Sequence, residues 1–299
     1  MGDNLQPIFE RFTSQPQKFL HHYTGVGTLL SMLKNDEPEF WLSDIAYLND
    51  SQELLYAHEI MENLLAESEY TKNRNQAAIP FLKLFSSILG LKNNIHAHVY
   101  VMSFSEAPDN LNQWRSYTPH GKGIDLAFNF REPEDFLSEN NISLVKCEYE
   151  KEKQIDLVNR LIIHIEESFS IFFEDHLWPA STADINMTKE LDFHFRSTLS
   201  LGYKIFSIIK HPAFKDEQEW RLVCLPSEHH GIDVDYREGS NMLIPYIKTR
   251  IDLEKYLNAI IIGPTEHKDL SMEAILGLLK KHNRSKIGTS CSQIPYREW

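Results

Sequence analysis

The chain has 299 residues, of which 42% are hydrophobic and 24% charged, a composition typical of a globular protein long enough to bury a sizeable core. Its formal net charge of -13 argues against a broad electrostatic surface for nucleic acid, although a local basic groove is compatible with it. The three cysteines are far apart and form no CxxC pair, which predicts neither a disulfide framework nor a zinc ribbon and fits a reducing cytoplasm. The N-terminus lacks the features of a signal peptide, and no run reaches the roughly 18 apolar residues of a membrane span, so we expect a cytoplasmic protein without a membrane segment.

Hydrophobic periodicity predicts short strands with helices between them. The predicted strands span residues 18–23, 39–43, 96–104, 124–128, 143–149, 219–225, 241–247, 259–262 and 287–295. The predicted helices span residues 26–33, 51–67, 70–94, 109–117, 152–207 and 271–281. Because these helices interrupt the strands without a regular βαβ alternation, the pattern indicates an α+β fold rather than a doubly wound sheet. No linker rich in Pro, Gly or Ser divides the chain, so we expect one domain over residues 1–299 with helical insertions at about 52–95 and 152–207.

The stretch at residues 214–223 places two glutamates, Glu217 and Glu219, before Trp220 and Arg221. If the chain is extended here, both carboxylates project from one face, because side chains alternate with period two. Keeping two carboxylates beside a core strand is costly unless they have a role. Two other interpretations remain open: an edge strand with a solvated acidic face, or an ion pair between Glu219 and Arg221.

Common catalytic and cofactor motifs are missing from the sequence. There is no GxGxxG, P-loop, GxSxG or HExxH, so nothing supports a Rossmann fold, an NTPase, a serine hydrolase or a zinc protease. His96 and His98 would share one face of a strand, but no third metal ligand is evident. We therefore expect a function that requires no metal.

Short polar and aromatic motifs are instead scattered along the chain. They are His22-Tyr23-Thr24, Trp41-Leu42-Ser43, Tyr47-Leu48-Asn49-Asp50, Ser103-Phe104-Ser105, Trp114 with Tyr117, Gly121-Lys122-Gly123-Ile124 and Glu217-Gln218-Glu219-Trp220-Arg221. Each has an ordinary structural explanation, such as a core histidine, a helix stripe or a hairpin turn. In this order, over roughly residues 20–265, they resemble a widespread prokaryotic family of unknown function.

The His-Tyr-Thr strand end and the late Glu-x-Glu also look like the ADP-ribosyltransferase superfamily, which implies a split mixed or antiparallel sheet. The resemblance implies that His22 holds the NAD ribose and that Tyr23 or Thr24 seats the nicotinamide. In that superfamily a serine or tyrosine of a middle strand supports the cleft, and the resemblance makes Ser43 or Tyr47 the candidate for this role. The sequence has no clean Ser-Thr-Ser motif at that point. It assigns Glu219 as the catalytic carboxylate and Glu217 as the residue that orients the acceptor.

This resemblance implies that NAD is the substrate and that no metal is required. Cleavage of the nicotinamide–ribose bond passes through an oxocarbenium-like state, which a carboxylate such as Glu219 can stabilise. Aromatic side chains such as Tyr23, Trp41 or Trp114 can flank the flat nicotinamide. Lys122 and Arg221 are the nearest motif cations for the pyrophosphate.

The expected function is therefore NAD-dependent ADP-ribosyl transfer to a protein or nucleic acid, the activity of superfamily toxins in toxin–antitoxin and phage-defence systems. An antitoxin or other regulatory protein is then a candidate partner. For a nucleic-acid acceptor, the lysines and arginines of residues 146–160 and 204–221 would supply a basic groove. The alternatives are an NAD glycohydrolase on the same scaffold, or a non-catalytic module that senses a nucleotide or binds a protein.

Overall fold

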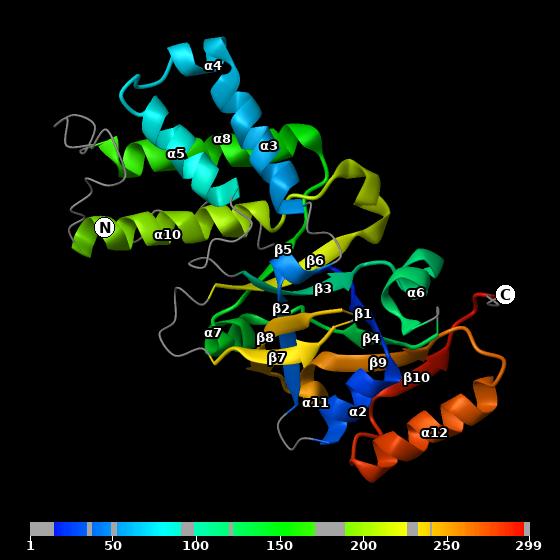
Figure 1. Ribbon diagram of the computed structural model, residues 1–299. Helices are drawn as coiled ribbons and strands as arrows, with labels where there is room; N and C mark the ends of the chain where they lie inside the picture. The colour runs from blue at the N-terminus through cyan, green and yellow to red at the C-terminus, as the bar shows by residue number, and fades with distance from the viewer. Residues whose placement is uncertain are drawn as a thin grey trace.

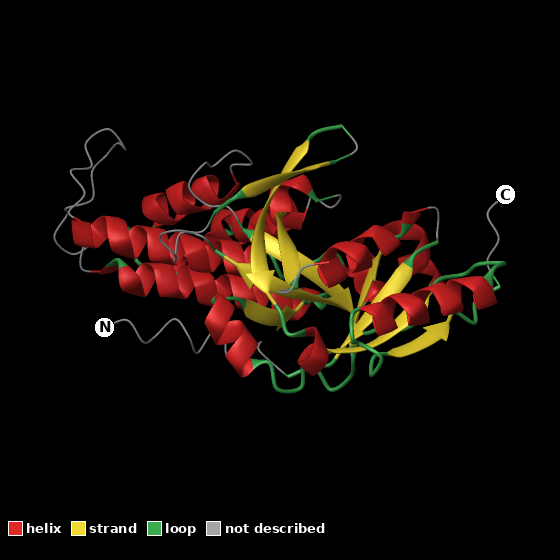
Figure 2. Ribbon diagram, turned by 90° about the horizontal axis from the view of Figure 1, so that it is seen from below, coloured by secondary structure: helices red, strands yellow, loops and turns green. Residues whose placement is uncertain are grey.

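A ten-stranded mixed sheet organises the molecule (Figures 1 and 2). The computed structural model describes residues 15–34, 38–48, 53–90, 99–119, 122–170, 189–225, 233–239 and 241–295. The strands are β1 (Leu20–Thr24), β2 (Glu39–Asp44), β3 (Tyr100–Ser105), β4 (Ile124–Phe128), β5 (Ser143–Lys146), β6 (Glu219–Cys224), β7 (Asp235–Glu238), β8 (Leu243–Arg250), β9 (Leu257–Ile262) and β10 (Gly288–Cys291). Their order is β10-β9-β4-β1-β3-β2-β8-β7, with β6 pairing both β3 and β5. Every named strand pair is antiparallel except β9 with β10.

Helices cover the sheet on both sides. They are α2 (Val26–Lys34), α3 (Glu53–Ala66), α4 (Ser68–Lys72), α5 (Ile79–Gly90), α6 (Leu111–Tyr117), α7 (Glu134–Asn140), α8 (Lys151–Ser168), α10 (Lys189–Phe206), α11 (Leu253–Tyr256) and α12 (Lys268–Lys281), with 3₁₀ turns η1 (Ile45–Tyr47) and η4 (Pro212–Glu217). Helices α3, α5, α8 and α10 pack together at one end of the molecule, while α2 and α12 lie at the other (Figure 1). Within the described residues, no helix combines the length and the apolar character needed to cross a bilayer.

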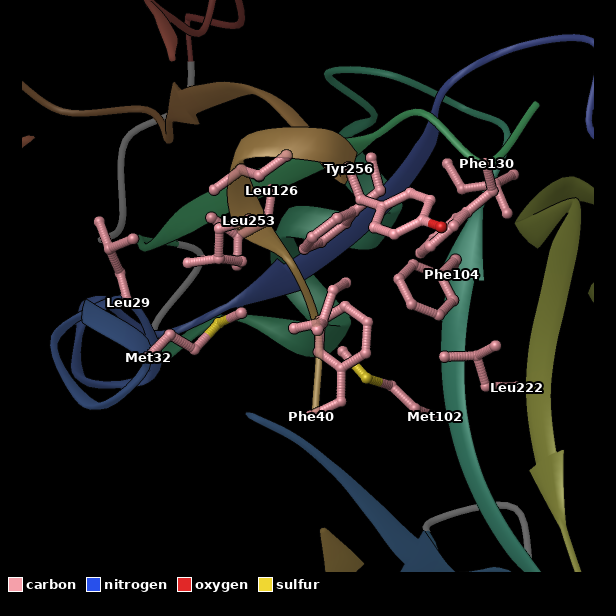
Figure 3. Close-up of a cluster of buried hydrophobic side chains, with 14 of the residues drawn as sticks. Leu29, Met32, Phe40, Met102, Phe104, Leu126, Phe130, Leu222, Leu253 and Tyr256 are labelled. Atoms are coloured by element: carbon pink, nitrogen blue, oxygen red, sulfur yellow. The ribbon is translucent and has the colours of Figure 1, made fainter. Parts of the chain in front are cut away.

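The two faces of the sheet belong to two hydrophobic cores. Strand β3 sends Val101 into the core under the helical bundle and Met102 into the opposite core, as the alternation of a strand requires. The second core is rich in aromatic rings, and Phe40, Phe104 and Phe130 lie within it together with Met102 (Figure 3). These rings meet at centroid distances of 5.5–6.0 Å in edge-to-face contacts, which fix their relative positions.

The sheet splits along one edge of β3. Strand β6 pairs with β3 over all six residues, so β1 and β2 must share the other edge. Strand β1 meets that edge at Ser105, through His21, whereas β2 meets it at Tyr100 and Val101. The strands β1 and β2 therefore diverge between these contacts, and the segment of β3 between them opens toward the site described below.

At the level of secondary structure, the expectation of an α+β chain with a mixed sheet is confirmed. Two local interpretations are wrong, and two short elements were not predicted. The strand β6 is not a solvated edge, because it pairs on both sides and all six of its residues are buried. Glu217 and Glu219 do not alternate along one strand, because Glu217 ends η4 and Gln218 has a φ of 47°. Sequence periodicity also missed the short elements α7 and β7.

Several motif residues cannot be placed. Asn49, Asp50, His96, His98 and Gly121 lie outside the described residues. The same holds for residues 171–188 within the predicted helical region 152–207.

Candidate functional site

A cavity of about 890 Å³ lies where β1 and β2 separate. That volume is within the range of about 300–1,000 Å³ typical of ligand sites. His22 and Glu219, nearly two hundred positions apart in the sequence, both line it. A smaller cavity of about 80 Å³ shares His22 and Glu219 with the larger one and adds Glu217 and His21 to its wall. The two cavities thus bring together the histidines of β1 and both glutamates of the late motif.

The side chain of His22 bridges the split. Its Nδ1 lies 2.9 Å from the backbone oxygen of Ser103, in the part of β3 that pairs with neither β1 nor β2. Because a carbonyl oxygen only accepts, Nδ1 carries the proton. Burial lowers the pKa of His22 below its ordinary value, although the bond to Ser103 opposes that shift. The neutral ring therefore keeps Nε2 as a hydrogen-bond acceptor.

Glu219 is a buried and ionised carboxylate. Its Oε1 accepts from Arg221 Nε at 2.7 Å, and its Oε2 accepts from Lys210 Nζ at 2.5 Å and from Arg221 Nη2 at 3.2 Å. Burial alone would raise the pKa of Glu219, but the Arg221 and Lys210 charges and their hydrogen bonds outweigh it and hold the pKa at about 2. The ion pair between Glu219 and Arg221 that the sequence left open is therefore present in the structure.

Lys210 joins the two glutamates. It is fully buried, and its Nζ donates to Glu217 Oε2 at 2.5 Å as well as to Glu219. The hydroxyl of Tyr117 donates to the other oxygen of Glu217, at 2.9 Å. The raised pKa of Tyr117, caused first by burial and then by the Glu217 charge, keeps that hydroxyl protonated. One compact cluster thus contains two carboxylates, those of Glu217 and Glu219, and two cations, Lys210 and Arg221.

Sequence reasoning missed Lys210 as a site residue. The signal that was present is a single lysine directly after an apolar run, Ile205-Phe206-Ser207-Ile208-Ile209. A lysine seldom lies fully buried unless a charge pairs with it, so its position predicts a buried carboxylate.

His21 and Asp125 form a second buried pair beside the smaller cavity. His21 Nδ1 lies 2.7 Å from Asp125 Oδ2, and the other oxygen of Asp125 is buried without a hydrogen-bond partner among the described residues. Burial raises the pKa of Asp125, and the bond to His21 opposes that rise. Because side chains alternate along β1, His21 and His22 project to opposite faces of the strand. The sequence singled out only His22.

Of three predicted site residues, Tyr23 lines the larger cavity, whereas Trp114 and Lys122 do not. The hydroxyl of Tyr23 donates to the Ala107 backbone at 2.6 Å, so this ring lines the cavity with its polar atom already used. Trp114 is fully buried, its Nε1 donates to Asp109 at 2.9 Å, and it does not line the cavity. Lys122 is exposed and also lies outside the lining. Trp114 is therefore not positioned to flank a ligand in this cavity, nor Lys122 to bind a pyrophosphate there.

Thr24, Ser43 and Tyr47 all line the larger cavity. The Thr24 hydroxyl lies 2.7 Å from the hydroxyl of Thr28, at the start of α2. Tyr47 is 41% exposed, so its ring is accessible to a ligand.

Two further residues give the cavity its aromatic and basic walls. Trp41 is 42% exposed and stacks on Tyr246, with 4.5 Å between the ring centroids. Arg237 of β7, which the sequence analysis did not single out, donates from Nη2 to the Ser43 hydroxyl at 3.0 Å. No group of three or more His, Cys, Asp or Glu side chains in the described part of the chain is arranged to hold a metal ion.

Comparison with known protein families gives a match to part of the chain. Residues 113–222 match the model of a family described as a protein of unknown function (DUF2971). This segment runs from α6 to β6 and contains Tyr117, Lys210, Glu217, Glu219 and Arg221, which make up the cluster of charges and its tyrosine. The searches of the curated proteins and of the solved structures gave no match. The expected likeness to a family of unknown function is supported over this segment.

Proposed function

We propose that the larger cavity binds NAD and that the protein cleaves the nicotinamide–ribose bond, with transfer of ADP-ribose to a macromolecular acceptor. The observation that carries this proposal is that His22 of β1 and Glu219 of β6 line one cavity at the split of the sheet. A split, largely antiparallel sheet with these residues beside the opening is compatible with an ADP-ribosyltransferase-like fold.

The charge state of Glu219 suits the proposed reaction. When the bond from C1′ of the ribose to the nicotinamide nitrogen breaks, its electron pair leaves with nicotinamide and positive charge develops on the ribose. An ionised carboxylate stabilises that charge. An acceptor oxygen or nitrogen then bonds to C1′ and loses its proton, for which Glu217 is the candidate base because it lies beside Glu219 in the wall of the smaller cavity.

The tautomer of His22 refines its role. Its Nδ1 proton is already donated to Ser103, so His22 is not placed to donate to a phosphate through that atom. Its Nε2 is instead an acceptor for a ribose hydroxyl. Trp41 takes the place expected of Trp114 as the exposed ring against which a flat base stacks.

Release of nicotinamide from NAD tests the proposal. His22→Asn keeps an N–H that reaches toward Ser103 but removes the acceptor Nε2, so we expect turnover to fall by a factor of about 100 or more while the fold is retained. The exposed His267, at the start of α12, supplies the matched control His267→Asn. If the wild type releases no nicotinamide with lysate as a source of acceptors, or if His22→Asn is as active as the wild type, the proposal fails.

A second function, nucleotide binding without turnover, is favoured by one observation. Both oxygens of Glu219 already accept bonds from cations, which offsets part of the negative charge that the reaction needs. Stabilisation against heat by NAD or ADP-ribose without release of nicotinamide supports this alternative.

The acceptor and an antitoxin-like partner are proposed from the resemblance alone. An NAD glycohydrolase would use the same site, with water as the acceptor. Mass spectrometry of protein and nucleic acid from cells that express the chain, with a search for added ADP-ribose, identifies the acceptor. Free ADP-ribose as the sole product indicates the glycohydrolase.

A further inference from the structure

Arg237 presents a cation to the larger cavity. It lies in β7, is partly buried, and lines the cavity together with Ser43, to whose hydroxyl it donates at 3.0 Å. The serine does not neutralise the guanidinium, because a hydroxyl carries no charge.

The other cations of this cavity differ from Arg237 in their pairing. Lys210 and Arg221 both bond to Glu219, whereas no carboxylate of the described residues lies within ion-pairing distance of Arg237. Burial lowers the pKa of the Arg237 guanidinium, which means that its charge is partly withdrawn from water. Arginine nevertheless stays charged in proteins. A partly desolvated cation without a counter-charge is stabilised by an anion that enters the cavity.

Strand pairing places this cation on the same face as the aromatic wall. Ser43 of β2 and Asp235 of β7 both pair with Tyr246 of β8, so the three share one face of the sheet. Arg237 follows Asp235 by two residues and Trp41 precedes Ser43 by two, so both project from that face as well. A ligand with a flat ring and an anionic group meets Trp41 and Arg237 on one continuous surface.

We propose that Arg237 and Ser43 form an anion subsite that binds the phosphate groups of a nucleotide. A guanidinium donates two parallel hydrogen bonds to phosphate oxygens, which makes arginine well suited to this ligand. The Ser43 hydroxyl holds the guanidinium in position. The subsite replaces Lys122 and Arg221, the cations that the sequence suggested for the pyrophosphate, because Lys122 lies outside the cavity lining and Arg221 pairs with Glu219. Only the identification of the nucleotide as NAD rests on the proposed function.

The carboxylates of the cavity wall do not occupy this subsite. Glu39 and Glu238 line the cavity, but neither forms an ion pair with Arg237 in the described structure. Their negative charges repel an anion from the parts of the wall beside them, which restricts where the phosphates can lie.

Calorimetric titration with inorganic pyrophosphate, ADP-ribose and adenosine tests the subsite. In Arg237→Met, which keeps the length of the side chain, we expect pyrophosphate and ADP-ribose to bind about 10- to 100-fold more weakly, because a charge-assisted pair is lost. Adenosine, which has no phosphate, should bind equally to both proteins. Lys248→Met is the matched control, because it removes one positive charge from the neighbouring strand β8 at a residue that pairs with Asp235 outside the cavity lining.

A second variant and the salt dependence keep the test decisive. Arg237→Lys retains the charge without the paired donors, so its affinity should lie between those of the wild type and Arg237→Met. Wild-type binding of pyrophosphate should weaken as ionic strength rises. The inference is overturned if the wild type binds neither pyrophosphate nor ADP-ribose, or if Arg237→Met binds them as the wild type does.

The outcomes separate this inference from the proposed function. Binding of ADP-ribose that depends on Arg237, without release of nicotinamide from NAD, contradicts the proposed reaction and supports the subsite. If nicotinamide is released and Arg237→Met does not change the KM for NAD, the subsite is contradicted and the reaction is supported.

Discussion

Replacing Glu219 by glutamine tests the charged cluster directly. Glutamine has the same shape, but it presents an amide instead of the carboxylate that bonds to Lys210 and Arg221. One end of that amide carries hydrogens and repels the cation it meets. Both cations are almost fully buried, so neither can turn to water for a replacement partner.

The expected cost follows from the buried ion pairs. Removing one partner of such a pair costs about 3–5 kcal/mol, because the remaining charge stays buried without compensation. The depressed pKa gives a similar figure. It lies at about 2 against an ordinary value of 4.5 for glutamate, and at about 1.4 kcal/mol per pKa unit this corresponds to about 3 kcal/mol of stability.

The pH dependence has a definite sign. The folded state holds the pKa of Glu219 below its unfolded value, so the stabilisation is fully present above pH 4.5 and is lost as the pH falls toward about 2. The glutamine variant has no proton to bind at this position. The difference in stability between wild type and Glu219→Gln should therefore be constant from neutral pH down to about pH 5 and should narrow below it.

Urea denaturation at several pH values measures this difference. Glu254→Gln is a suitable control, because Glu254 pairs with Arg284 at the surface with 63% of its side chain exposed, and such pairs contribute about 1 kcal/mol or less. The reasoning is refuted if Glu219→Gln loses less than about 1 kcal/mol at neutral pH, or if the gap to the wild type is the same at acidic pH.

Two other substitutions test residues in or next to the cavity walls. Gly123→Ala should lower the free energy of unfolding by about 1–3 kcal/mol, because the added Cβ would overlap the backbone oxygen of Thr24. Thermal denaturation measures the loss of stability, and an unchanged melting temperature would contradict the prediction. Gly277→Ala is the control, because its Cβ meets nothing within 4 Å and should stabilise α12 by about 1 kcal/mol. Tyr117→Phe removes the hydroxyl that donates to Glu217, which should lower the free energy of unfolding by about 1 kcal/mol. The rate of nicotinamide release should also fall, and an unchanged rate excludes a role for that hydrogen bond in the reaction.

Local patterns in the sequence were sufficient to predict most of the helices and strands. The strand predicted at residues 124–128 has the bounds of β4, and the helix predicted at residues 26–33 lies within α2. Both are continuous apolar or periodic runs whose conformation depends mainly on their own residues. The ion pair of Glu219 with Arg221, one of the interpretations that the sequence left open, was also within reach, because the two residues are close in the sequence.

Non-local pairing explains what the sequence did not reveal. The strand β7 has only four residues, none of them buried, so it carries no hydrophobic signal and forms only because β8 offers an edge. Arg237 was overlooked for that reason. Trp114 was misplaced for the opposite reason: an aromatic motif residue looks the same whether it faces a ligand or a core. It is buried against residues distant in the sequence, among them Tyr23, with 4.8 Å between ring centroids.

The split in the sheet and the histidine beside it depend on each other. Opening the edge of β3 leaves backbone groups without a strand partner, and an unpaired buried carbonyl is costly. His22 satisfies the Ser103 carbonyl with a side chain, which takes up less of the edge than a strand would and leaves room for the cavity. The same cavity is lined by the ionised Glu219 and by Arg237, which forms no ion pair with a carboxylate of the described residues. The proposed nucleotide ligand would lie between these two groups, whether it is cleaved or only bound.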